Sequence, residues 1–133
     1  MRAWLEIDLG AIAHNTRLVR AHVGSNTRVC AVVKADAYGH GIEPVAQVLD
    51  QEGIDHFAVI SLDEAMRVRS VSGLDVLIMG YLDDQEIEEA VRQGFVLSLF
   101  DRDLVDVYVA ASQKVGCARR LAALAAQESQ ALA

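Results

Sequence analysis

Four short apolar runs, each followed by a helical pattern, constrain the fold of this 133-residue chain more than any other feature. The runs cover residues 29–33, 57–60, 76–79 and 95–100, and short connections separate them from the helical segments. Continuous apolar runs of this length are typical of strands buried on both faces of a parallel sheet. Strands and helices that alternate in this way predict an α/β fold with a parallel sheet and right-handed crossovers.

Capping and turn residues predict where the helices begin and end. A first helix should follow residue 9 and end at Gly24. Ser61 and Glu64 have the spacing of a capping box, which predicts a helix over about residues 62–70. Asp83 or Asp84 can cap a helix that runs to residue 93, and the aspartate at position 101 can cap the last regular helix.

Composition excludes several classes of partner. The net charge is −7 and the basic residues form no cluster, which argues against nucleic acid or an anionic membrane. No apolar run approaches the roughly 20 residues that span a bilayer, and acids come too early for a signal peptide. Cys30 and Cys117 lie far apart, so we expect no disulfide, no metal site and a cytoplasmic protein, with Cys30 buried in its strand.

Lys34 lies where the first apolar run ends and a loop with Gly39 and Gly41 begins. In α/β folds this edge of the sheet is where ligands bind. A lysine amine at such a site can form a Schiff base with an aldehyde. The alternative is that Lys34 extends from a strand end into water and has no chemical role. The chain has one other lysine, Lys114, which we place at the end of a polar-faced helix.

Residues 31–41, Ala-Val-Val-Lys-Ala-Asp-Ala-Tyr-Gly-His-Gly, resemble the pyridoxal-phosphate (PLP) lysine motif of bacterial alanine racemases. Residues 4–15, 61–65 and 78–81 also resemble segments of that family. The resemblance runs from about residue 4 to about residue 117. A complete (β/α)₈ barrel takes about 250 residues, so the resemblance implies a partial barrel, the half of a PLP-dependent TIM-type barrel that forms the family's N-terminal domain.

The resemblance implies roles for particular residues. Lys34 would hold PLP covalently and act as acid and base on one face of the substrate Cα, with L-alanine and D-alanine as substrates. Tyr38 would hydrogen-bond the PLP phosphate. From the residues themselves we expect His40 to shape the loop, Asp36 to orient it without an assigned step, and Tyr108, on a core-facing helix stripe, to pack in the core. The second acid/base of the family belongs to a C-terminal domain of the partner subunit, so we expect this chain to be inactive alone.

We divide the chain into a lead-in strand and helix over 1–28, four βα units over 29–116, and an alanine-rich helical tail over 117–133 that departs from the family. A partial barrel leaves unpaired sheet edges, which predicts a homo-oligomer. Two alternatives stay open. The chain could be a non-catalytic PLP-binding or protein-interaction domain, or a plain open α/β domain in which Lys34 is incidental.

Overall fold

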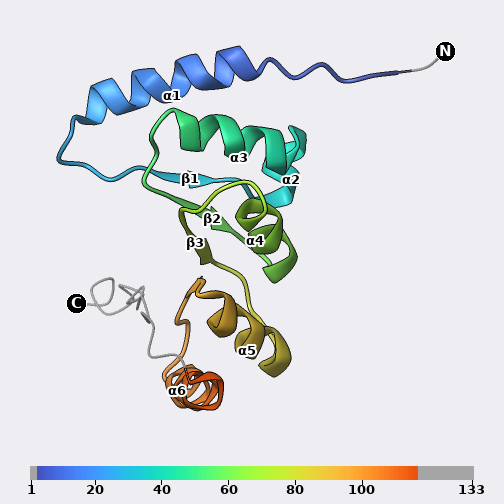
Figure 1. The fold of residues 1–133 in the computed structure, drawn as a ribbon, viewed down its shortest axis with the longest axis vertical. Coiled ribbons are helices and arrows are strands. Elements are labelled where there is room, and N and C mark those ends of the chain that lie inside the picture. Colours follow the sequence, from blue (N-terminus) through green and yellow to red (C-terminus); the bar gives the residue numbers. More distant parts are fainter. Residues whose placement is uncertain (1–2, 117–133) are drawn as a thin grey trace, which may run out of the picture.

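The computed structural model describes residues 3–116 and contains one four-stranded sheet with six helices (Figure 1). The helices are α1 (Leu9–Val23), α2 (Lys34–Gly39), α3 (Ile42–Gln51), α4 (Leu62–Arg69), α5 (Asp84–Gln93) and α6 (Asp103–Val115). The strands are β1 (Cys30–Val32), β2 (His56–Val59), β3 (Asp75–Ile78) and β4 (Val96–Leu97). No helix in this part of the chain is long and apolar enough to cross a membrane.

The sheet is parallel throughout and its strands lie in sequence order, β1-β2-β3-β4. This order confirms the prediction of an α/β fold built from consecutive βα units, as in the first part of a barrel. Within the described residues, β1 and β4 each pair on one side only. Their other sides present unpaired backbone groups, so the sheet has two open edges.

The two faces of the sheet differ in burial. Phe57, Val59 and Ile78 are fully buried and belong to the core between the sheet and the helices. Side chains alternate between faces along a strand, so the intervening positions point the other way. One residue of each strand that points this way is paired with the next across the sheet, in the order Val32, Ala58, Leu77 and Val96. None of these four belongs to the core between the sheet and the helices. The helices therefore cover one face of the sheet more completely than the other.

The expectation that residues 29–33 form a strand buried on both faces, with Cys30 buried, is wrong. Cys30 is exposed and Val32 retains 39% of its exposure. The physical reason is that β1 is an edge strand whose outer face lies on the less covered side of the sheet. The Cys30 thiol is still partly screened from water, and this desolvation raises its pKa.

Two further boundaries differ from expectation. The fourth strand is only Val96–Leu97. The backbone N–H of Ser98 still donates to the Ile78 carbonyl (3.2 Å), whereas the Ser98 carbonyl accepts from the Tyr108 hydroxyl of α6 (2.9 Å). Residues 3–8 form no strand. Asp101 does not occupy the cap position of α6, which Arg102 takes without a side-chain cap. The predicted tail over 117–133 lies outside the described residues.

The predicted helix ends are largely confirmed. Asp83 caps α5 in a capping box with Glu86, and Gly94 ends this helix in the left-handed conformation. Gly24 ends α1, which lies beside α3 in Figure 1. Tyr108 is 4% exposed and packs in the core as predicted.

Candidate functional site

Lys34 lies at the carboxyl edge of the sheet. The backbone N–H of Val33 donates to the Ala58 carbonyl (2.9 Å), which is the last contact of β1 with β2, and Lys34 is the next residue. Its side chain is half-buried and has no hydrogen bond or ion pair within residues 3–116. Lys114 differs because it is ion-paired with Glu88. The amine of Lys34 is therefore available to a ligand, whereas that of Lys114 is engaged.

The segment after Lys34 is a left-handed turn. Ala35, Asp36, Ala37 and Tyr38 have φ angles of 53–56° and ψ angles of 35–50°. Residues other than glycine rarely adopt this conformation, and four in succession are exceptional, because each side chain crowds the following carbonyl. Such strain persists only where the surrounding structure holds it, and it occurs mainly at functional sites. The expectation of an ordinary loop after Lys34 is therefore wrong in its backbone conformation.

Local hydrogen bonds close the turn at both ends. The Ala37 N–H donates to the carbonyl of Val33 (2.9 Å), and the Gly41 N–H donates to the carbonyl of Asp36 (2.9 Å). The Asp36 carboxylate accepts from the backbone N–H of Ile42 (3.0 Å), which links the turn to the start of α3. The predicted orienting role of Asp36 thus has a contact to support it.

His40 also contacts the turn. Its Nδ1 lies 2.9 Å from the carbonyl oxygen of Ala37, and its backbone N–H donates to the same carbonyl (3.2 Å). This arrangement is what a loop-shaping residue requires.

Helix α4 supplies two side chains that sequence reasoning did not assign to the site. The Glu64 carboxylate accepts from the backbone N–H of Ala35 (2.6 Å) with Oε1 and from that of Ile60 (3.0 Å) with Oε2. Arg67 donates through Nη2 to the Asp36 carboxylate (2.7 Å). It also donates two hydrogen bonds to the Glu43 carboxylate, from Nε (2.6 Å) and Nη2 (2.7 Å). Hydrogen bonds from Arg67 lower the pKa of Glu43. The Ser61–Glu64 spacing is a signal for the start of a helix and does not by itself indicate that Glu64 reaches the site.

Tyr38 is the last residue of the turn, whereas Lys34 directly precedes its first residue. It is 60% exposed and lines a cleft of about 500 Å³ together with Gly39 and His40. The other walls come from residues 5–8 and the first turns of α1. Lys34 does not line this cleft. The two predicted site residues, Lys34 and Tyr38, are thus linked by the turn, but only Tyr38 faces the cleft.

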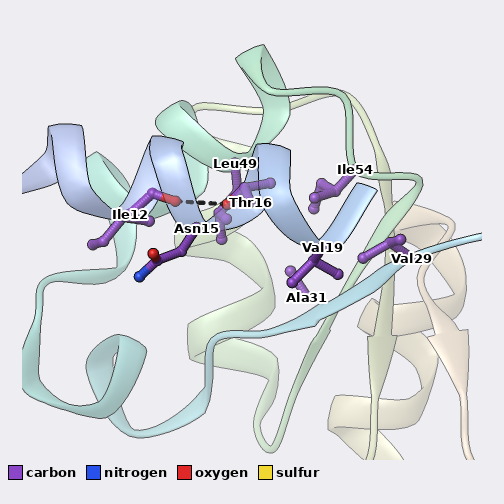
Figure 2. Close-up of a pocket in the computed structure, with 8 residues that line it drawn as sticks. All are labelled: Ile12, Asn15, Thr16, Val19, Val29, Ala31, Leu49 and Ile54. Atoms are coloured by element: carbon purple, nitrogen blue, oxygen red, sulfur yellow. Dashed lines mark hydrogen bonds between the residues drawn. The ribbon is translucent and has the colours of Figure 1, made fainter. Parts of the chain in front are cut away.

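A second hollow lies between α1, α3 and β1 (Figure 2). Its volume is about 240 Å³ and its lining is mostly aliphatic, with the amide of Asn15 and the hydroxyl of Thr16 as polar groups. The Thr16 hydroxyl donates to the Ile12 carbonyl (2.8 Å), as the dashed line in Figure 2 shows. The hollow thus has no charged group that could bind a phosphate.

Two side chains at the turn offer groups that an organic ligand can use. No group of three or more potential metal-ligating side chains occurs in residues 3–116. Lys34 offers a primary amine for an aldehyde, and Tyr38 offers an exposed hydroxyl for a phosphate oxygen. These two donors fit the aldehyde and phosphate groups of PLP.

Comparisons with known proteins identify relatives of this chain and of its fold. The family model described as alanine racemase, N-terminal domain, matches residues 7–124. A protein of Desulforamulus reducens named alanine racemase is 41% identical over 115 residues, which are 85% of this chain and 31% of that protein. The solved alanine racemase of Streptomyces coelicolor superposes with a TM-score of 0.80 at 26% identity, over 86% of this chain and 31% of that one.

A second solved structure, an alanine racemase of Bacillus anthracis with bound L-Ala-P, superposes with a TM-score of 0.74 at 32% identity. That superposition covers 81% of this chain and 28% of the other. The chain therefore spans less than a third of the length of these three proteins.

Proposed function

The chain belongs to the alanine racemase N-terminal domain family, and on this premise we propose that it supplies the PLP-holding half barrel of an alanine racemase. The observation that carries the proposal is the unpaired, half-buried amine of Lys34 at the carboxyl edge of a parallel sheet, followed by a strained turn. The substrates of this role are L-alanine and D-alanine, the amino acid in the names of the relatives.

Two residues of this chain would hold the cofactor. Lys34 would be the point of covalent attachment, and the Tyr38 hydroxyl would donate to a phosphate oxygen. When bound, PLP supplies an electron sink that makes the Cα proton of an amino acid removable. The work left to the protein is to orient the amine, to exclude water and to move a proton, and Nζ of Lys34 would exchange that proton on one face of Cα.

Racemisation also needs an acid/base on the opposite face of Cα. Of the other described tyrosines, Tyr108 uses its hydroxyl to donate to the Ser98 carbonyl, and Tyr81 is a largely exposed residue whose ring stacks on Phe100 with centroids 4.5 Å apart. We therefore propose that the 133-residue polypeptide takes up PLP on Lys34 and does not interconvert the alanine enantiomers at a measurable rate by itself.

Chemical trapping tests the cofactor role. The purified chain is mixed with PLP, reduced with borohydride and digested, and peptide mass spectrometry then measures the label on Lys34 and Lys114. Lys114 is a control within the same molecule because it is exposed and ion-paired with Glu88. We expect label on Lys34 at low PLP concentration and its loss in Lys34→Ala. Equal label on both lysines would overturn the proposal.

A coupled assay for D-alanine tests the second half of the proposal. The expected result is PLP uptake without turnover, and robust turnover by the 133-residue chain would contradict it. The alternative of a non-catalytic binding or interaction domain is favoured by one observation, the two open edges of the sheet. Adding the remaining barrel and C-terminal domain of a relative separates the two, because restored racemisation supports the enzyme role.

A further inference from the structure

We infer that Glu64 and Arg67 are positioning residues, which hold the left-handed turn of residues 35–38 and so fix Lys34 and Tyr38 at its two ends. This inference rests on the function proposed above, and it adds two residues to the site that lie on a different helix. Three features support it: the unfavourable backbone of the turn, the hydrogen bonds of Glu64 to two strand-end backbone groups, and the hydrogen bonds of Arg67 to Asp36 and Glu43.

The turn does not form because of its own sequence. Short polar side chains make the left-handed conformation tolerable at single positions, but Ala35, Ala37 and Tyr38 have no such side chain. The conformation is therefore energetically unfavourable at each position of the turn. Buried neighbours explain only part of the turn: Val33 and Ala37 are buried, whereas Ala35, Asp36 and Tyr38 are exposed. Contacts from outside the segment must therefore select this conformation over a right-handed or extended one.

Glu64 makes such a contact at the entry to the turn. It is the third residue of α4, where a glutamate ordinarily accepts from the backbone of its own cap residue. The Ser61 hydroxyl does accept from the Glu64 N–H (3.2 Å), but the Glu64 carboxylate bonds Ala35 and Ile60 instead. One carboxylate thereby joins the chain leaving β1 to the chain leaving β2, and it fixes the first left-handed residue.

Arg67 makes the second contact, one turn further along α4. Residues three apart on a helix lie on the same side, so Arg67 and Glu64 can face the turn together. The guanidinium binds Glu43 of α3 in two-pronged fashion and reaches Asp36 with the same Nη2. A planar guanidinium that binds a carboxylate through two N–H groups holds it in one orientation, whereas a lysine ammonium provides only a point charge.

Matched variants test the inference. Glu64→Gln keeps size and helix position but provides one acceptor oxygen for two N–H donors. Its control is Glu86→Gln, the third residue of α5, where Glu86 accepts only from its own cap residue Asp83 (3.0 Å). Arg67→Lys keeps the charge and loses the two-pronged contact with Glu43, and its control is Arg92→Lys in the last turn of α5.

The first readout needs no cofactor. Amide hydrogen exchange of the peptide that covers residues 34–42 is compared with exchange in β2 and β3. We expect roughly ten-fold faster exchange in this peptide for Glu64→Gln, in line with the loss of a hydrogen bond to a charged group, and no change in the core strands or in either control. Unchanged exchange in residues 34–42 would overturn the inference, because the turn would then persist without its supports.

The second readout is the ratio of PLP label on Lys34 to label on Lys114. A general loss of stability affects both lysines, whereas a loss of positioning lowers the label on Lys34 alone. We expect a several-fold lower ratio for Glu64→Gln and Arg67→Lys and an unchanged ratio for both controls. If the parent chain labels Lys34 and the variants label it equally, the inference is overturned while the proposed function stands. If the parent chain does not label Lys34, the proposed function fails and the positioning role fails with it.

Discussion

Replacing Ala35 by glycine should stabilise this protein, which is the reverse of the usual effect of glycine. Ala35 has a φ of 53° and an exposed side chain, so the change removes a crowded Cβ and no buried contact. A left-handed L-residue costs about 1–2 kcal/mol, and glycine avoids this cost. Glycine also makes the unfolded chain more flexible, which costs about 0.4–1 kcal/mol. Taking the middle of each range, the net gain in the free energy of unfolding should be about 0.8 kcal/mol, with an upper end of about 1.6 kcal/mol.

The same exchange at Ala110 provides the control. Ala110 is also exposed but lies inside the right-handed helix α6, where glycine costs about 1 kcal/mol. Urea unfolding followed by circular dichroism, at one protein concentration, measures both variants. The two should differ from the parent in opposite directions. If Ala35→Gly destabilises the protein as Ala110→Gly does, the left-handed turn is not the conformation of this segment in solution.

Three further predictions concern the sheet and its edges. Gly80→Ala should cost about 3 kcal/mol or more in urea unfolding, because the added Cβ would lie 2.0 Å from the Ile60 carbonyl oxygen, whereas Gly73→Ala, with open space around it, should be nearly neutral. Asp55→Asn should destabilise the protein at pH 7, because the bond from the Val29 N–H lowers the pKa of Asp55. A carboxylate with a lowered pKa stabilises the fold fully above its ordinary pKa of 3.8 and loses this effect as the pH falls through the folded pKa. The stability gap between the two proteins should therefore shrink steadily on acidification below pH 3.8, and a gap that stays constant there would refute this reading. The open edges of β1 and β4 should cause self-association in sedimentation experiments, and a monodisperse monomer would contradict this.

The sequence predicts the order of elements well because periodicity and capping are local signals. The capping residue Asp83 of α5, for example, is identifiable from its place before a helical pattern. What the sequence does not reveal is which strand lies at an edge. Cys30 sits in an apolar run that is typical of a buried strand, yet its exposure depends on neighbours that the run itself does not encode.

The candidate site shows the same division. Lys34 could be singled out from its place after a strand and from the motif around it. Glu64 and Arg67 could not be assigned, because their role depends on hydrogen bonds to residues about thirty positions earlier in the chain. Local propensity also favours the wrong hand for residues 35–38, so no reasoning from short segments could have found the turn.

That separation in sequence has a consequence for biosynthesis. Glu64 and Arg67 follow their partners in the turn by 29 and 31 residues, so a growing polypeptide that has not yet reached α4 contains the lysine but neither anchor. Contacts of such long range form only after the intervening chain has closed. The left-handed turn should therefore form late in folding, after the first two βα units have assembled. Reactivity of Lys34 toward aldehydes would then report that this assembly is complete.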